Sequence, residues 1–376
     1  MTDKIARFLA DRQPETPCLV VDLDVIAESY LTLRRLLPLA QVFYAVKANP
    51  AVEIVGMLNE LGSSFDTASR GEIDLVLDNG ADASRVSFGN TIKKERDIAR
   101  AHALGVKLFA VDSGEEVEKV ARAAPAASVF CRILTDGAGA EWPLSRKFGC
   151  EPAMAVDVLM HAHALGLEAY GISFHVGSQQ TRLAAWDSAL EESKAIFDAM
   201  QARGITLKMV NLGGGFPTKY LKEVPGTGSY ANAIHEALTK HFGNAIPETI
   251  IEPGRGMVGN AGVVKAEVVL ISKKHANDNI RWVYLDIGKF GGLAETMDEA
   301  IRYPIVTAKD GDAKAPCVIA GPTCDSADVL YEKTPYDLPV TLNVGDEVLI
   351  EATGAYTTTY AAVAFNGFSP LKSYVI

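Results

Sequence analysis

The chain has 376 residues, 48% of them hydrophobic and 22% charged, which is typical of a globular protein with a sizeable buried core. Its formal net charge of −11 argues against nucleic acid, whose phosphates need a basic surface, and suits a small cationic ligand. No signal peptide or membrane-length apolar run is visible, and the five cysteines form no CxxC pair. We therefore expect a cytoplasmic protein with no metal site, no nucleic acid and no membrane as partner.

The first strand candidate in the chain is PCLVVDLDVI (17–26), which could join either of two domains. From residue 42 onward, apolar β-branched runs alternate with helix-like stretches such as AWDSALEESKAIFDAMQARG (185–204). The eight runs are VFYAVK (42–47), SSFDTA (63–68), RVSFGN (85–90), LFAVDS (108–113), SVFCRIL (128–134), YGISFHV (170–176), MVNLGG (209–214) and TIIEPG (249–254). Each run but the last is followed by a clear helix candidate, which predicts parallel strands and a (β/α)8 barrel. A doubly wound open sheet is the structural alternative.

The pattern changes after about residue 260. Turn residues separate β-rich segments with partial alternation, which predicts a second, all-β domain. The segments are GVVKAEVVLISKK (262–274), RWVYLDIG (281–288), PCVIAG (316–321) and VGDEVLIEATG (344–354).

Polar residues collect where the predicted barrel strands end, which is where barrel enzymes place their catalytic groups. Lys47 ends an apolar strand; a strand-end lysine usually just reaches solvent, but a desolvated amine could form a Schiff base. The run 213–215 of three glycines exposes backbone N–H groups that could cradle a phosphate, although it could also be a plain loop. Arg255 offers a cation to the same phosphate, and Glu252 could keep a pyridine nitrogen protonated. Together these residues describe a site for pyridoxal 5′-phosphate.

Ten motifs in order support that interpretation across essentially the whole chain. They are YAVKANP, FDTASRGEI, SFGN, FAVDS, LSRKFG, GISFHVGSQ, NLGGGFP, IIEPGRG, GPTCDSAD and GAYTTTYAAVAFNGF. With these motifs the chain resembles the ornithine/diaminopimelate/arginine decarboxylase family of fold-type-III pyridoxal phosphate enzymes. It looks most like the bacterial members of the eukaryotic ornithine decarboxylase type, some of which also use lysine.

The resemblance implies an alanine racemase-like fold, in which a β domain follows the barrel and takes back an N-terminal strand. The barrel would span residues 24–260, and the β domain would combine 1–23 with 261–376. The family also implies a homodimer in which each active site is shared between two subunits.

The resemblance assigns the catalytic roles as follows. Lys47 would form the Schiff base with the cofactor, and His175 would stack on its ring. Glu252 would pair with the pyridine nitrogen, and Cys324, entering from the partner subunit, would protonate the substrate's Cα. The other implied cofactor-binding residues are Asp66, Arg132, Ser178, Gly213, Gly214, Gly215, Gly254, Arg255 and Tyr356.

The implied reaction is decarboxylation of L-ornithine to putrescine in polyamine biosynthesis, with lysine to cadaverine as a second reaction. A helical segment around Asp298 would bind the distal amine of this small cationic substrate. Asp325 would add negative charge from the partner subunit, and Glu295 is a second nearby carboxylate. The segment KFGGLAETMDEAIRYP, which contains Asp298, departs from the eukaryotic enzymes and leaves the preferred side-chain length open.

Other functions within this fold remain as alternatives. Diaminopimelate decarboxylase shares the HxGSQ and EPGR motifs, but GPTCDS followed by acidic residues favours a diamine product. Alanine racemase shares the fold but would lack this set of motifs, and a one-domain cofactor-storage protein would not need the β domain or Cys324. A catalytically inactive regulator would not need to keep Lys47, His175, Glu252, Arg255 and Cys324.

Overall fold

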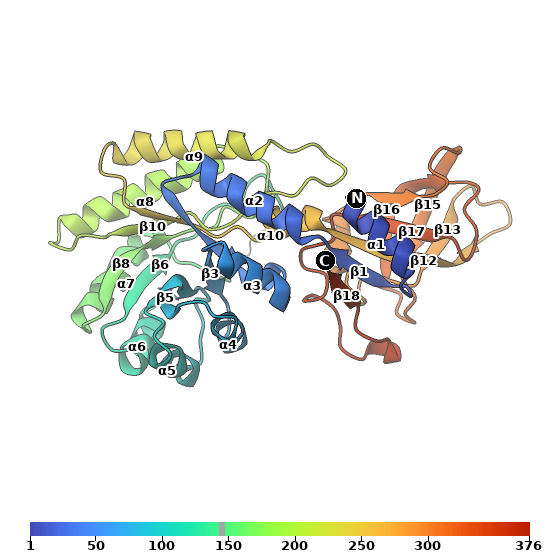
Figure 1. Cartoon of the computed structure of the whole chain (residues 1–376). Helices are drawn as coiled ribbons and strands as arrows, with labels where there is room; N and C mark the ends of the chain where they lie inside the picture. The colour runs from blue at the N-terminus through green and yellow to red at the C-terminus, as the bar shows by residue number, and fades with distance from the viewer. Residues whose placement is uncertain (143–146) are drawn as a thin grey trace. The chain divides into compact units, whose positions relative to one another are not determined.

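A computed structural model describes residues 1–142 and 147–376 of the chain (Figure 1). The described residues form two compact units. Unit 1 contains Met1–Ile26, Thr218–Glu223 and Met257–Ile376, and unit 2 contains Ala27–Pro217 and Val224–Gly256. Each unit is described by itself.

Unit 2 is a closed barrel of eight parallel strands. The spatial order is β10-β11-β2-β3-β4-β5-β6-β8, and pairing of β11 with β2 closes the ring. The predicted (β/α)8 barrel is confirmed, and the open-sheet alternative is wrong because an open sheet would leave β2 and β11 as edges. The strands are β2 (Ala40–Ala45), β3 (Ser64–Thr67), β4 (Val86–Phe88), β5 (Leu108–Val111), β6 (Ser128–Arg132), β8 (Glu168–Ser173), β10 (Met209–Asn211) and β11 (Glu248–Ile251).

A helix connects each barrel strand to the next one. Local capping fixes several helix starts directly after the strand ends: Ser69 accepts a hydrogen bond from the N–H of Glu72, and the Glu72 carboxylate accepts one from Ala68. Short strand-to-helix connections of this kind hold the strand-end side chains in place. The helices are α3 (Val52–Glu60), α4 (Arg70–Asp78), α5 (Glu95–Ala103), α6 (Gly114–Ala123), α7 (Pro152–Ala164), α8 (Ala185–Gln201) and α9 (Thr227–Phe242).

Apolar side chains from five of the barrel strands pack as one buried cluster. Its members are Phe43, Ala110, Phe130, Met209 and Ile250. Each lies in one of the apolar runs that predicted a strand. Their burial stabilises the barrel, and the polar residues of the same runs lie at the strand ends.

Unit 1 is built around an eight-stranded sheet with the main order β14-β17-β12-β13-β15-β16. It begins with α1 (Asp3–Arg12), which is capped by Thr2 and packs Ile5 against Val20 and Val263. The four strands predicted after residue 260 are confirmed as β12, β13, β15 and β17. The strand bounds are β1 (Cys18–Val21), β12 (Gly262–Ser272), β13 (Arg281–Leu285), β14 (Ile305–Thr307), β15 (Lys314–Ala320), β16 (Val329–Pro339), β17 (Glu347–Glu351) and β18 (Lys372–Val375).

The segment PCLVVDLDVI resolves into two elements. Cys18–Val21 forms β1, which pairs antiparallel with β12 and parallel with β18 and so belongs to this sheet. Helix α2 (Leu23–Leu36) begins just after it. The sequence did not predict β14, β16 or β18, because β14 is very short and β16 contains charged residues and proline.

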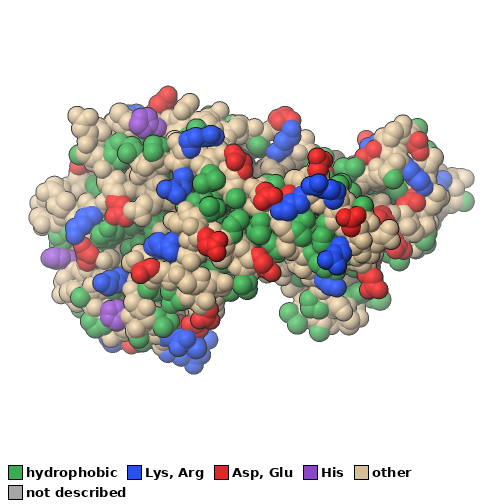
Figure 2. Space-filling view, viewed as in Figure 1, with side chains coloured by type: hydrophobic (Ala, Val, Ile, Leu, Met, Phe, Trp, Pro, Cys, Tyr) green, Lys and Arg blue, Asp and Glu red, His purple; other side chains and the backbone are tan. Residues whose placement is uncertain are grey.

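The surface carries both signs of charge. On the face shown in Figure 2, acidic and basic side chains are interspersed with apolar ones. Among the residues that the structure describes, no helix has both the length and the apolarity that crossing a bilayer requires.

Candidate active site

The Lys47 amine and the Asp66 carboxylate meet at the end of two adjacent barrel strands. Lys47 lies in a short 3-10 turn (η1, Val46–Ala48) after β2, and its Nζ is 3.1 Å from Oδ2 of Asp66 on β3. The Lys47 side chain is 46% exposed and that of Asp66 is 4% exposed. The Lys47 amine is therefore not desolvated in the single chain, although desolvation is what would activate it. The buried carboxylate instead fixes where the amine lies.

Asp66 is held by the neighbouring strand. Ser87 of β4 donates its hydroxyl to Oδ1 of Asp66 at 3.4 Å. Gly89, two residues later, has to be glycine, because a β-carbon there would lie 1.8 Å from Oδ1 of Asp66. The SFGN motif thus leaves room for the Asp66 carboxylate.

Glu252 follows β11 and is a partly buried carboxylate in the same barrel. Burial is the main cause that raises its pKa to about 7, and the negative charge of Asp66 adds to the rise. Lys47, Arg132 and a hydrogen bond from Asn211 favour the ionised form and oppose the rise. A carboxyl group with this pKa can exchange a proton with a basic ring nitrogen at neutral pH.

His175 is held in its neutral form. Burial, followed by the positive charges of Arg132 and Lys47, lowers the pKa of His175 to about 3. Its Nδ1 accepts a hydrogen bond from the N–H of Gly177 at 2.9 Å, so the proton resides on Nε2. A neutral, fixed imidazole is suited to stacking on an aromatic ring.

The glycine run packs so closely that side chains cannot be accommodated. A β-carbon would lie 2.1 Å from Phe174 O at Gly213, 2.7 Å from Glu252 O at Gly214 and 2.8 Å from Gly177 O at Gly215. Gly213 and Gly215 also have positive φ, which favours glycine. The run is therefore more than a plain loop, because neighbouring strand ends fix its backbone.

Ser178 and Arg255 lie next to this run. The guanidinium Nε of buried Arg255 donates to Oγ of Ser178 at 3.1 Å, and the N–H of Gln180 bonds to Gly215 O. Ser178 lies on β9 (Ser178–Gln180), which pairs with β7 (Ala140–Trp142). These groups offer a hydroxyl, a guanidinium and backbone amides, the donor set that a phosphate group requires.

Gly254 joins this region to the lysine. A β-carbon at Gly254 would lie 3.0 Å from Cβ of Ala48 and 3.2 Å from Cβ of Ala45, on either side of Lys47. The N–H of Ala45 also donates to Pro253 O. Glycine here lets the EPGR segment pack directly against the turn that carries Lys47.

Arg132 ends β6. Burial lowers the pKa of its guanidinium, while the charges of Glu252, Asp66 and Asp112 oppose the shift. The Arg132 guanidinium also lies 5.4 Å from the centre of the Phe148 ring. The motif LSRKFG, which contains Phe148, lies partly outside the described residues, since its first three positions fall in the range 143–146.

The other predicted residues belong to unit 1. Cys324 is the exposed member of the five free cysteines, and its N–H donates to Oδ1 of Asn366 at 2.8 Å. The Asp325 carboxylate accepts a hydrogen bond from the N–H of Ala327. The sequence analysis overlooked buried Asp328, although it is the last residue of GPTCDSAD.

Asp328 shapes the turn that presents Cys324. Its carboxylate accepts hydrogen bonds from the N–H of Lys289 (2.7 Å) and from the N–H and hydroxyl of Thr323 (3.1 and 2.7 Å). Gly288 and Gly321 leave space for it, because a β-carbon at either position would approach a carboxylate oxygen within 2.3 Å. Asp328 therefore fixes the backbone on both sides of the turn.

The helical segment expected around Asp298 is only a short 3-10 element (η4, Ala294–Glu299). Met297 and Asp298 have non-helical backbone angles, and φ of Asp298 is 53°. The Asp298 side chain is 86% exposed and forms an ion pair with Lys333, whereas Glu295 is buried. Tyr356, the predicted phosphate ligand in this unit, also has a positive φ of 56°.

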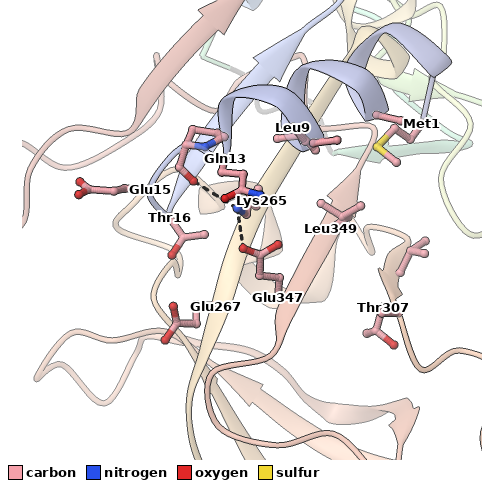
Figure 3. Close-up of a pocket in the computed structure, with 15 residues that line it drawn as sticks. Met1, Leu9, Gln13, Glu15, Thr16, Lys265, Glu267, Thr307, Glu347 and Leu349 are labelled. Atoms are coloured by element: carbon pink, nitrogen blue, oxygen red, sulfur yellow. Dashed lines mark hydrogen bonds and ion pairs between the residues drawn. The ribbon is translucent and has the colours of Figure 1, made fainter.

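A pocket of about 850 Å³ in unit 1 is separate from all of these residues. It is lined by α1, the segment that follows it and strands β12, β14 and β17 (Figure 3). At one wall the Lys265 amine bonds to Glu347 and to Pro14 O. None of the predicted site residues lines it, so this pocket is not the candidate active site.

Comparisons with known proteins give consistent results. Residues 23–259 match the family model for the pyridoxal-binding domain of pyridoxal-dependent decarboxylases. The chain is 38% identical to a lysine/ornithine decarboxylase of Selenomonas ruminantium, over 98% of this chain and 91% of that protein. It is 31% identical to antizyme inhibitor 2 of Xenopus laevis, over 98% and 82% of the two chains.

A solved structure shows the same similarity. The lysine/ornithine decarboxylase of Vibrio vulnificus, solved in complex with cadaverine, superposes with a TM-score of 0.89 and 32% sequence identity. The superposition covers 100% of this chain and 99% of that one.

Proposed function

The chain belongs to the family of pyridoxal-dependent decarboxylases, and from that premise we propose that it converts L-ornithine to putrescine, with L-lysine as a second substrate. The observation that carries the proposal is the partly buried Glu252 carboxylate with its raised pKa, which shares one barrel end with the Lys47–Asp66 pair and the glycine run. This geometry supports pyridoxal phosphate chemistry, and the relatives named above indicate the class of amino acid.

The described residues fit pyridoxal phosphate. Glycines 213–215, Ser178 and Arg255 form a donor-lined cradle for the phosphate, and Tyr356 is proposed as a further ligand from unit 1. Gly254 is proposed as part of the same cradle. When bound, the cofactor supplies an electron sink for the pair of electrons left when the carboxylate departs.

The chain's own residues would prepare that chemistry. Lys47 provides the amine, and Asp66 holds it in place while Arg132 adds a positive charge nearby. Glu252 would exchange a proton with the ring nitrogen, and neutral His175 would pack against the ring without competing for that proton. These roles are proposals for five residues at the ends of five barrel strands.

The substrate would be recognised by charge. Its distal ammonium must end at a carboxylate, because an unpaired buried cation is costly. Asp298, Asp325 and Glu295 are the proposed partners in unit 1. Ornithine and lysine differ by one methylene, which a pocket distinguishes by only about 1–3 kcal/mol, so we expect activity on both.

We further propose a cytoplasmic homodimer whose active sites are shared. Cys324 would act in the partner's site as the acid that delivers a proton to Cα. It lies in a unit whose surface exposes apolar side chains, including Tyr360, Phe368 and 88%-exposed Val363. Such a surface is suited to contact with a second copy of the chain.

A panel of substrates tests the proposed activity. The purified protein with pyridoxal phosphate is incubated with L-ornithine, L-lysine, L-arginine and meso-diaminopimelate, and carbon dioxide and amine products are measured. We expect putrescine from ornithine and a slower formation of cadaverine from lysine. Product from diaminopimelate alone would show that the proposed substrate class is wrong.

A regulatory role is the second candidate, because one relative carries the name of an inhibitor and not of an enzyme. Visible absorbance of the purified protein with added cofactor separates the two. A protein that acquires no cofactor band and releases no carbon dioxide from any substrate would favour the regulatory role.

A further inference from the structure

The carboxamide of Asn211 connects the glycine run to Glu252. Asn211 is the last residue of β10 and is buried. Its Oδ1 accepts a hydrogen bond from the N–H of Gly213 at 2.9 Å, and its Nδ2 donates to Oε1 of Glu252 at 2.5 Å. The orientation of the amide is determined, because the Gly213 N–H can only donate and so requires the oxygen.

A third hydrogen bond closes the arrangement. The N–H of Glu252 donates to Gly213 O at 2.8 Å, so three residues are linked in a ring of three hydrogen bonds. The backbone of Gly213 is tightly packed, because a β-carbon added there would lie 2.1 Å from Phe174 O. Gly213 therefore has no room to shift. A displacement of Glu252 would therefore break a hydrogen bond at the glycine run as well.

The charges around Glu252 give the Asn211 amide a second effect, on the ionisation of Glu252. Asp66 disfavours a charge on Glu252, whereas Lys47 and Arg132 favour it. A neutral amide that donates to Oε1 stabilises the carboxylate without adding another charge to the barrel end. A carboxylate at position 211 would instead repel Glu252 unless a proton lay between them.

We propose that Asn211 is a positioning residue for the decarboxylation proposed above: its amide orients Glu252 against the glycine run and holds it as the hydrogen-bond acceptor for the protonated ring nitrogen. The catalytic role of Asn211 rests on the proposed function, decarboxylation. The Asn211–Glu252 contact itself is a property of the chain and can be measured without the cofactor.

Two variants and one control test this role. Asn211→Ala removes the Nδ2 donor. Asn211→Asp keeps the shape of the side chain, but the new carboxyl group can donate to Glu252 only while that carboxyl group is itself protonated. Ser173→Ala is the matched control, because Ser173 is buried and is paired with Asn211 in the ladder between β8 and β10. Among the described residues, the side-chain hydrogen bond to Glu252 comes from Asn211 and not from Ser173. Circular dichroism verifies that all three proteins fold.

The first measurement uses the full chain without cofactor. Infrared titration follows the Glu252 carboxyl band, which is assigned by its loss in Glu252→Gln. Asn211→Ala should raise the midpoint by about one pH unit, the effect of losing a hydrogen bond to a charged group. Asn211→Asp should show two linked steps, the upper one above the wild-type midpoint, and Ser173→Ala should titrate like the wild type.

The second measurement is the Kd of pyridoxal 5′-phosphate across the pH range. Asn211→Ala should weaken binding about tenfold at every pH at which Glu252 is ionised. Asn211→Asp should bind like the wild type at low pH and approach Asn211→Ala as the pH rises. In turnover, Asn211→Ala should lower kcat while KM for ornithine stays within about twofold, because Asn211 does not touch the substrate.

The outcomes are decisive in either direction. If Asn211→Ala leaves both the carboxyl midpoint and the Kd of the cofactor at wild-type values, or if Ser173→Ala shifts them equally, Asn211 is not a positioning residue. A wild-type protein that binds the cofactor but forms no diamine contradicts the proposed function instead. In that case the midpoint and the Kd still decide whether Asn211 positions Glu252.

Discussion

The amine of Lys47 lies 3.1 Å from the carboxylate of Asp66, and the two come from consecutive strands of the barrel. The acid is buried and fixed by Ser87, whereas the amine is half-exposed. An amine held in this way is accessible to an incoming aldehyde while its position is set by the barrel.

Replacement of Lys47 by alanine should abolish turnover and the visible band of the covalently bound cofactor, because Lys47 provides the amine that pairs with Asp66 among the described residues. Lys47→Arg is the matched control: it keeps the positive charge but cannot form a Schiff base. Absorbance before and after borohydride reduction measures the bond. If Lys47→Ala keeps a band that borohydride fixes, Lys47 is not the attachment site.

Mixtures of the inactive Lys47→Ala variant and the slow Cys324→Ala variant should recover activity if the sites are shared. In a dimer of a Lys47→Ala chain and a Cys324→Ala chain, one site has both changes and the other has neither. Random exchange of equal amounts should give about a quarter of the wild-type activity. Absence of recovery, with subunit exchange verified by native mass spectrometry, would mean that each site is built within one chain.

The Cys324 thiol should control the fate of the product. In Cys324→Ala the proton is no longer delivered to Cα, so we expect slower turnover and an aldehyde among the products of ornithine. Cys317→Ala is the control, because burial raises the pKa of that thiol to about 11 and keeps it protonated. Chromatography that finds only putrescine, formed at the wild-type rate, would assign the proton to another acid.

The two acids of η4 should differ in effect. Asp298→Ala should raise KM for both ornithine and lysine, with little change in cofactor absorbance, because its exposed side chain contributes little to folding. Glu295→Ala should affect KM less, but it should lower the melting temperature because Glu295 is buried. Steady-state kinetics that show the larger KM effect for Glu295→Ala would reverse the assignment.

The cofactor-free protein should lose stability as its partly buried Glu252 ionises. The folded-state pKa of about 7 lies above that of an unfolded glutamic acid, so the protonated folded state is favoured and the contribution is lost as pH rises through 7. Between pH 4 and pH 8 the free energy of unfolding should fall by on the order of 3 kcal/mol more in the wild type than in Glu252→Gln. Urea unfolding at both pH values measures this, and equal pH dependence would contradict the raised pKa.

The sequence by itself determined the barrel and most of the chemistry placed on it. Strand and helix periodicities depend on residues close together in the chain, so the eight runs from VFYAVK to TIIEPG could be assigned one by one. The rule that parallel strands end at one edge then predicted that Lys47, Asp66 and Glu252 lie at the same end of the barrel.

Only the tertiary structure decided which side chains act on one another. The ring of hydrogen bonds through Asn211 joins residues of two strand ends, and the Asp328 carboxylate meets Lys289, which is 39 residues away. Likewise, the exposure of Asp298 arises from a left-handed turn that interrupts the expected helix. A local pattern cannot specify such distances, because they depend on where remote segments pack and which polar atoms are then left to pair.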